Sequence, residues 1–274
     1  MKATVRFTWK KVNRRTIDTN QKKRQEALSE IAVVLPSFEP DERLISTIDG
    51  LIRCGFSQII LIDDGSGSAF EHFFSDAVTG NPGKIILLRH NRNLGKGAAL
   101  KNGFRWIIDR GIEMKGIVTV DGDGQLLPED AARCSLNMLQ SERVTLGCRD
   151  FGHSEVPWRS RVGNRITSYI FRVLCGIRLS DTQTGLRAIP AAVLPGLIEV
   201  SGDRFEYETN MLLAMKSLRL KIDEVPITTV YIDQNKTTHF DTLKDSLRIY
   251  RIILTYVFGG KQAELKMKRR EMHE

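Results

Sequence analysis

The amino-acid sequence predicts an α/β protein in which a mostly parallel sheet is covered by helices on both faces. Three observations predict it. From residue 31 onward, short apolar runs alternate with longer periodic stretches that have helix-capping residues. The short runs are apolar throughout, which is typical of parallel strands buried on both faces. Polar residues follow these runs directly, at the point where open α/β sheets bind ligands.

Strands and helices are predicted in alternation up to residue 149. Strands are expected at residues 31–35, 58–63, 84–90, 116–121 and 144–149. Helices are expected at residues 41–54, 69–79, 96–110 and 128–139. Pro128 suits the first turn of its helix, and Glu129 and Asp130 follow at the positive end of the helix dipole. Alternation at this spacing indicates an open sheet of parallel strands.

The pattern is less regular after residue 149. Further helices are expected at residues 158–175 and 205–218, a loop and strand at 181–189, and strands at 220–225 and 227–232. Pro226 separates the last two, because proline cannot donate a hydrogen bond within a sheet. These elements complete a single domain, since 274 residues suffice for one large α/β unit.

The last predicted helix, over residues 242–258, has Leu243, Leu247, Tyr250 and Leu254 at helical spacing with charged residues between them. It can pack on the domain or lie in a membrane interface. We therefore divide the chain into a basic leader (1–30), a domain (31–239), an amphipathic helix (240–260) and a charged tail (261–274).

Positive charge is concentrated at the start of the chain. The formal net charge is +8, and residues 1–30, with nine basic and three acidic side chains, carry +6 of it. We expect this leader to be flexible; it can contact anionic lipid or nucleic acid, or stay solvated. Nucleic-acid binding as the main activity is not supported, because no basic stripe with interleaved aromatic residues follows.

Several classes of protein are excluded by patterns that the sequence lacks. No apolar run approaches the ~18 residues of a membrane-spanning helix, and the first residues lack the apolar core of a secretory signal. The four cysteines form no CxxC pair, which argues against zinc and fits reduced thiols. We therefore expect a cytoplasmic protein, which can lie peripherally on the cytoplasmic face of a membrane.

Polar residues follow the first two predicted strands. Residues 36–40 read PSFEP, and the absence of GxGxxG there argues against NAD or FAD binding. Asp63 and Asp64 follow the second strand. This pair can accept hydrogen bonds from a base or ribose, or it can cap the turn and helix that follow.

A glycine-rich segment, residues 93–100 (NLGKGAAL), precedes and opens the third predicted helix. Glycines at a helix start let backbone N–H groups approach an anion, and Lys96 can add positive charge. The full P-loop pattern is missing. Tight packing of the helix against its neighbours is the alternative.

The fourth predicted strand runs into Asp121, Asp123 and Gln125. Two carboxylates leaving a buried strand are penalised by desolvation unless a cation or hydrogen-bond donors meet them. Hard oxygen ligands suit Mg²⁺ or Mn²⁺ shared with substrate phosphates. An EF-hand is excluded because Leu126 and Ala132 stand where its Gly and Glu belong. A simple turn is the remaining alternative.

The polar segments and those around them occur in the order VLPSFEP, LIDDGS, RNLGKGAALKNG, VDGDGQ, LGCRD, SRVGN, DTQTGLRA, RFEYETNMLL and EVPI. This order resembles family 2 glycosyltransferases, and within them the dolichyl- and polyprenyl-phosphate sugar transferases. The resemblance covers residues 31–258 and implies the GT-A fold. It departs from the family where Phe38, Glu39 and Pro40 replace the frequent Tyr-Asn-Glu.

The resemblance also implies roles for particular residues. The residues it places around the nucleotide and its phosphates are Pro36, Ser37, Glu39, Asp63, Asp64, Lys96, Asp121 and His239. His239 can equally have a capping or surface role. The residues it implies as ligands of Mg²⁺ or Mn²⁺ are Asp121, Asp123 and Gln125.

The remaining implied roles concern the sugar and the acceptor. Arg149 and Arg161 would receive an acceptor phosphate, and residues 181–187 would line the sugar site. The residues expected to act in the reaction are Asp123, Arg149, Arg161 and Asp181.

The activity expected from these residues is transfer of a sugar, with inversion, from a GDP- or UDP-sugar to polyprenyl phosphate. Such an acceptor is already ionised and needs no general base. The alternative is transfer to a saccharide or glycolipid hydroxyl, for which Asp181, Glu206 or Glu208 would remove the proton. The expected partners are the donor, the lipid phosphate, and a membrane surface or membrane protein, with no nucleic acid.

Overall fold

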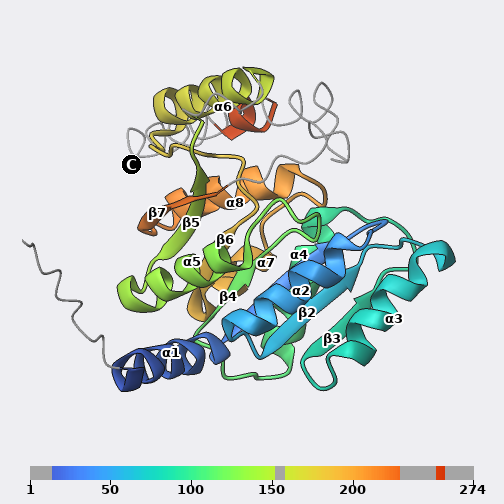
Figure 1. Cartoon of the computed structure of the whole chain (residues 1–274). Helices are drawn as coiled ribbons and strands as arrows, with labels where there is room; N and C mark the ends of the chain where they lie inside the picture. Colours follow the sequence, from blue (N-terminus) through green and yellow to red (C-terminus); the bar gives the residue numbers. More distant parts are fainter. Residues whose placement is uncertain (1–13, 152–157, 229–250, 257–274) are drawn as a thin grey trace, which may run out of the picture.

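The computed structural model describes residues 14–151, 158–228 and 251–256, and it confirms the predicted α/β architecture (Figure 1). Within these described residues, seven strands form one sheet in the order β3-β2-β1-β4-β6-β5-β7. They are β1 (Ile31–Ser37), β2 (Gln58–Asp63), β3 (Ile85–Arg89), β4 (Gly116–Thr119), β5 (Val144–Arg149), β6 (Arg187–Pro190) and β7 (Ile222–Ile227).

The sheet is parallel except at β6, which pairs antiparallel with both β4 and β5. The first residue of β6, Arg187, lies opposite Thr119, the last residue of β4. The chain that leads into β6 therefore arrives at the carboxyl end of β4. This reversal brings residues 181–186 to the edge where the parallel strands end.

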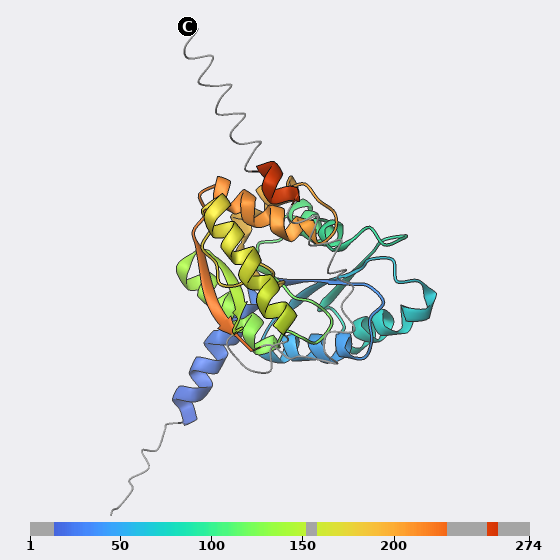
Figure 2. The same ribbon diagram turned by 90° about the horizontal axis from the view of Figure 1, so that it is seen from above.

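Helices cover both faces of the sheet, as predicted (Figure 2). The main ones are α1 (Arg14–Ser29), α2 (Arg43–Cys54), α3 (Glu71–Gly80), α4 (Lys96–Asp109), α5 (Pro128–Ser141), α6 (Trp158–Ile170), α7 (Leu194–Ile198) and α8 (Glu206–Ser217). Ile31, Val33 and Leu35 of β1 pack in one core with α2, α3 and α5. Ala32 and Val34 pack in the other with α4, α7 and α8. Because successive strand residues enter opposite cores, the strands are apolar throughout.

The first described residues form helix α1, where the sequence predicts part of a flexible leader. Leu28, near the end of α1, is buried in the same core as β1, and α1 packs against α5. The last turns of the leader are therefore anchored to the domain. Flexibility of the remainder stays a prediction.

Three predicted elements differ in the structure. Pro226 lies within β7, which tolerates it because β7 is the edge strand among the described residues and pairs there only with β5. Residues 229–232 of the strand predicted at 227–232 lie outside the described residues. The helix predicted at 158–175 ends as α6 at Ile170 and continues as a π-helical turn over Phe171–Cys175. Of the amphipathic helix predicted at 240–260, only residues 251–256 are described, and they are helical.

Within the described parts of the chain, no helix is both long and apolar enough to cross a membrane.

Candidate active site

The carboxyl ends of β1, β2 and β4 meet at one edge of the sheet. Ser37 lies opposite Asp63, the last residue of β2. The N–H of Asp64 donates to the Ser37 carbonyl at 2.8 Å, and the N–H of Val120 donates to the Val34 carbonyl at 3.2 Å. Candidate residues from three separate segments therefore share this edge.

The segment after β1 is fixed by the segment after β2. Pro36 is half-buried within β1, and Glu39 is exposed two residues after the strand. Glu39 has a φ of 49°, and its N–H donates to Ser66 Oγ at 2.9 Å. The N–H of Ser66 in turn donates to Asp63 Oδ1 at 2.9 Å. Asp63 thus caps the turn after its own strand, which is one of the two roles that the sequence leaves open.

Asp64 organises the segment before α4. It is buried; its Oδ1 accepts the N–H of Leu94 at 2.9 Å, and its Oδ2 accepts the N–H of Gly95 at 2.8 Å. His90 Nδ1 lies 2.7 Å from Oδ1, and the Nδ2 of Asn102 lies 3.1 Å from His90 Nε2. Sequence reasoning did not identify His90 as part of the site. His90 directly follows β3, so a search for polar residues at strand ends would have found it.

Replacing Asp64 with Asn is expected to lower the free energy of unfolding by about 3 kcal/mol, because a neutral amide cannot accept all three bonds that the carboxylate receives. Urea denaturation measures the change. Asp76→Asn, at an exposed position of α3, is the control and should change the free energy by less than about 0.5 kcal/mol. Equal effects of the two substitutions would contradict the role of Asp64.

The start of α4 is packed tightly, and two of the backbone amide groups there already have partners. The N–H of Gly95 is held by the carboxylate just described, and the N–H of Ala98 donates to the Asp203 carbonyl at 2.9 Å. A Cβ at Gly97 would overlap the side chain of Tyr207. This contact supports the packing interpretation of the glycine segment, and the approach of its other amides to an anion stays a prediction.

Lys96 points into the site from the first turn of α4. Its Nζ lies 2.8 Å from Asp121 Oδ1 and 3.1 Å from Glu208 Oε2. Burial alone lowers the pKa of Lys96, but the two carboxylates outweigh it, and the pKa lies above its usual value. Lys96 is therefore a largely buried ammonium group, charged at neutral pH, beside the first carboxylate of the DGDG segment.

Gly185 leaves the room that this ion pair occupies. A Cβ at this position would overlap Asp121 Oδ2 and lie 3.0 Å from Lys96 Nζ. The Gly185 carbonyl accepts the hydroxyl of Thr119 at 2.6 Å, which holds the loop against the end of β4. The loop before β6 thus forms one wall of the site.

Replacing Gly185 with Ala is expected to lower the rate of the sugar transfer that the sequence predicts by about 10- to 100-fold, because the new methyl group would displace the Asp121 carboxylate. Initial rates with saturating donor measure the effect. Gly80→Ala is the control, since a Cβ at Gly80 meets nothing within 4 Å. Wild-type rates for Gly185→Ala would show that Asp121 does not need its present position.

Asp123 is the second carboxylate of the segment. Burial, and then the nearby charge of Asp121, raise the pKa of Asp123 above its usual value. Its Oδ1 accepts the N–H of Gln125 at 3.0 Å. Two crowded acidic groups with oxygen donors are the set that suits a hard divalent cation, so the residues fit Mg²⁺ or Mn²⁺. Within the described residues, no group of three or more His, Cys, Asp or Glu is already assembled for a metal.

Arg149, the last residue of β5, is held by a wholly buried carboxylate. Asp181 is 0% exposed. Its Oδ2 accepts Arg149 Nε at 2.6 Å, and its Oδ1 accepts Arg149 Nη2 at 3.0 Å and the N–H of Gln183 at 3.0 Å. Two parallel hydrogen bonds fix the plane of the guanidinium as well as its position. Asp181 is therefore the residue that positions Arg149.

The three candidate general bases all have partners of their own. Asp181 is paired with Arg149, Glu208 is paired with Lys96, and Glu206 Oε1 accepts the two backbone N–H groups of residues 203 and 204 at 3.3 Å. Each of these three carboxylates therefore already accepts hydrogen bonds or an ion pair from within the protein.

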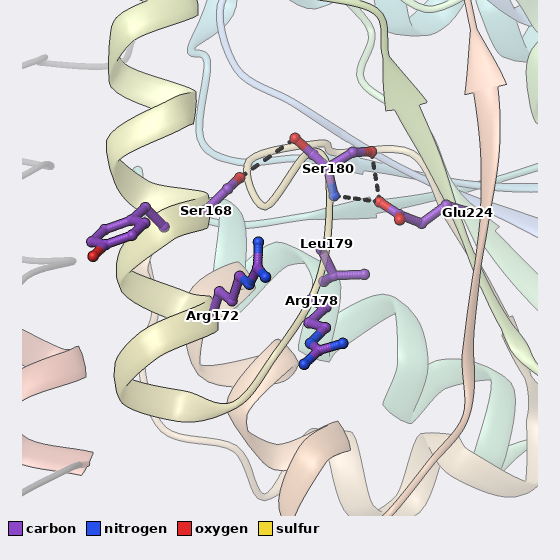
Figure 3. A pocket seen from close by; sticks show the side chains of 7 residues that line it. Ser168, Arg172, Arg178, Leu179, Ser180 and Glu224 are labelled. Atoms are coloured by element: carbon purple, nitrogen blue, oxygen red, sulfur yellow. Dashed lines mark hydrogen bonds between the residues drawn. The ribbon is translucent and has the colours of Figure 1, made fainter.

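Arg161 lies on α6, and His239 lies outside the described residues. A cavity of about 530 Å³ lies between α6, residues 178–180 and β7 (Figure 3). Ser180, which lines it, directly precedes Asp181, and its N–H donates to Glu224 Oε1 at 2.6 Å. The cavity therefore borders the segment that carries Asp181.

A fully buried arginine completes the walls of the site. Arg187 donates from Nε to the Thr184 carbonyl at 3.1 Å and from Nη1 to the Glu208 carbonyl at 2.8 Å. It thereby joins the loop before β6 to the first turn of α8. Sequence reasoning placed Arg187 in the segment lining the sugar site but did not find this joining role, because it depends on which helix covers β6.

Comparison with known proteins gives relatives over most of the chain. A UDP-N-acetylglucosamine–dolichyl-phosphate N-acetylglucosaminyltransferase of Methanococcus voltae is 26% identical over 240 residues, covering 82% of this chain and 95% of the relative. A polyprenol monophosphomannose synthase of Mycolicibacterium smegmatis is 26% identical over 203 residues, covering 72% of this chain and 76% of the relative.

Among solved structures, the mannosyl-3-phosphoglycerate synthase of Rubrobacter xylanophilus superposes with a TM-score of 0.64 at 14% identity, over 90% of this chain and 79% of that one. This likeness concerns the fold and confirms the predicted GT-A architecture. The family model for glycosyl transferase family 2 matches residues 32–217, which include every described candidate residue. The chain therefore belongs to glycosyl transferase family 2.

Proposed function

We propose that this protein transfers a sugar, with inversion at the anomeric carbon, from a nucleoside-diphosphate sugar to a polyprenyl phosphate. Membership of the family supports glycosyl transfer, and the names of two relatives support a lipid phosphate as the acceptor. The observation that carries the proposal is the arginine of β5, Arg149, locked by a buried carboxylate while the candidate bases are engaged elsewhere.

The acceptor phosphate is proposed to lie against Arg149 and Arg161. A guanidinium whose plane is fixed suits a phosphate, because both present matching forks of hydrogen-bonding atoms. A phosphate oxygen of the ionised acceptor attacks the anomeric carbon. The bond from that carbon to the donor phosphate breaks, and the nucleoside diphosphate leaves with the electron pair. No proton has to be removed from the acceptor, so Asp181 can stay paired with Arg149 throughout the reaction.

The donor is proposed to lie along the edge formed by β1, β2 and β4. Its base and ribose would lie against Pro36, Ser37, Glu39 and the Asp63 turn, which the hydrogen bonds after β1 and β2 hold together. Its diphosphate would approach Asp121 and Asp123. A divalent cation held there by Asp121 and Asp123, with Gln125 nearby, would neutralise charge on the leaving diphosphate.

Lys96 has a defined part in this proposal. Its ammonium lies between Asp121 and Glu208, so it offsets part of their negative charge at the place where the diphosphate and its cation would be bound. Because the pKa of Lys96 is raised, this charge persists throughout the physiological pH range.

The test uses the purified full chain with Mn²⁺ or Mg²⁺, polyprenyl phosphate in detergent, and radiolabelled GDP-mannose, UDP-glucose or UDP-N-acetylglucosamine. Label is expected to move into the organic phase with one of these donors, and Arg149→Lys should reduce that rate. Donor consumption with label confined to a saccharide would instead support a hydroxyl acceptor. Label that stays aqueous with every donor would refute the proposal.

A further inference from the structure

Helix α6 presents apolar side chains to solvent and buries polar ones. Val162, Ile166, Tyr169 and Val173, at intervals of four, three and four residues, lie on one face of the helix and its π-helical continuation. These four residues, called here the α6 stripe, are 43–67% exposed. This is the reverse of the arrangement expected for a helix that packs on a domain through its apolar side.

Polar contacts fix the rotation of α6 about its axis. Asn164 and Thr167 are buried, and Asn164 Nδ2 donates to the Ser180 carbonyl at 2.8 Å. Ser168 Oγ contacts the same carbonyl at 3.4 Å. Because these contacts join α6 to the segment that carries Asp181, the helix cannot turn its apolar stripe inward without losing them. The α6 stripe therefore stays on the surface of the domain, where a partner can contact it.

The apolar exposure is concentrated in this segment. Nine large hydrophobic side chains are exposed in the described part of the chain, and five of them fall within residues 162–174. Single exposed apolar residues are ordinary, whereas a contiguous group indicates an interaction surface.

The charges around the stripe indicate the chemistry of the partner. Residues 158–180 contain five arginines and no aspartate or glutamate. Arg172 and Arg178 line the cavity beside α6 (Figure 3). Tyr169 of the stripe lines the same cavity. An apolar face bordered by positive charge is complementary to a membrane interface, where acyl chains lie beneath anionic headgroups.

We propose that the α6 stripe and its neighbouring arginines dock this domain on an anionic phospholipid membrane. The stripe enters the boundary between headgroups and acyl chains, and Arg172 and Arg178 contact lipid phosphates. The proposal rests on the proposed function in one respect, namely that a polyprenyl phosphate acceptor lies in such a membrane. Docking through α6 would place Arg161, on the same helix, next to the headgroup layer.

The test measures co-sedimentation of the full chain with vesicles of phosphatidylcholine alone or mixed with phosphatidylglycerol, neither containing polyprenyl phosphate or sugar donor. The wild-type chain should sediment with the anionic vesicles, and less at high salt. The double substitution Tyr169→Ser with Val173→Ser should weaken vesicle binding by about tenfold or more. Ile108→Ser, at another exposed apolar position, is the matched control and should bind like the wild type.

A charge variant tests the second part of the surface. Arg172→Gln with Arg178→Gln should weaken binding to anionic vesicles by about tenfold and leave the salt dependence smaller. Thermal unfolding of each variant shows whether it is folded, and all the replaced side chains are exposed.

Three outcomes would overturn the proposal. The wild-type chain could stay in the supernatant with both kinds of vesicle. The stripe variant could bind as tightly as the wild type, which would assign membrane binding to another segment. Sedimentation velocity could instead show a dimer that the stripe variant loses, which would assign the stripe to a second copy of the chain. Because no sugar is transferred in this assay, its failure is distinct from failure of the proposed function.

Discussion

Replacing Asp123 with Asn is expected to lower sugar transfer by about 1,000-fold, or about 4 kcal/mol of transition-state stabilisation, and to raise thermal stability at neutral pH. The loss of activity follows from removing one of the two carboxylates proposed to hold the cation. The gain in stability follows from the raised pKa of Asp123, because burial and Asp121 disfavour its charged form in the folded protein. Initial rates and the thermal midpoint measure the two effects.

The stability effect has a defined dependence on pH. A carboxyl group whose pKa is raised by folding binds its proton more tightly in the folded state than in the unfolded state. The stability that this bound proton gives to the folded state is therefore present at low pH. It is lost as the pH rises from the ordinary aspartate pKa of 3.8 through the raised pKa of Asp123. The advantage of Asp123→Asn should grow over that window and be constant above it.

Controls separate this effect from a general loss of charge. Asp109→Asn, at an exposed position at the end of α4, should alter neither rate nor thermal midpoint. In addition, Mn²⁺ with the matching nucleoside diphosphate should stabilise the wild type and not Asp123→Asn. Equal stabilisation of both by Mn²⁺ and nucleotide would show that Asp123 is not a cation ligand.

Replacing Arg149 with Met is expected to lower the free energy of unfolding by about 3–5 kcal/mol, because it would leave the wholly buried carboxyl group of Asp181 without its partner. Arg149→Lys should lose less stability, since it keeps the charge but not the two parallel hydrogen bonds. In the transfer assay, Arg149→Lys should also raise the KM for polyprenyl phosphate by about 10- to 100-fold. Urea denaturation and acceptor titration measure these changes.

Arg143→Met is the matched control for the stability measurement. Arg143 lies 3.2 Å from Asp223, in a pair whose side chains are 44% and 27% exposed, so breaking it should cost about 1 kcal/mol or less. If Arg149→Met were no less stable than Arg143→Met, the buried pair would contribute no more to the fold than an exposed one. If the KM for the acceptor were unchanged in Arg149→Lys, Arg149 would not be a phosphate contact.

The strands and the residues that follow them show how much of the fold and the site the sequence predicts. The apolar runs predict β1, β2 and β5 with errors of two residues or fewer, because burial on both faces leaves a strong one-dimensional signal. The family resemblance implies the role of Arg149. The rule that ligands lie beyond the carboxyl ends of parallel strands directs attention to Asp121 and Asp123 from the amino-acid pattern alone. These predictions depend only on which residues end a buried strand.

The partners of those residues depend on the tertiary structure. The sequence offers Asp181 as a catalytic base, but only the fold brings it beside Arg149, 32 positions earlier in the chain. It likewise joins Lys96 to Glu208 and lets Arg187 bind the first turn of α8. Periodicity and spacing describe one segment at a time, whereas a salt bridge requires two segments to be placed to within about 1 Å.

The antiparallel strand β6 shows the same difference between what the sequence determines and what the tertiary structure determines. The sequence by itself determined an α/β sheet, the order of its elements, and the residues at the strand ends. Each of these features depends on the local pattern of apolar residues and on the residues that form turns. Only the tertiary structure decided that β6 runs against its neighbours and brings Gly185 against Asp121. The direction of a short strand is set by the long-range contacts on both of its sides, and no local pattern in a four-residue segment encodes it.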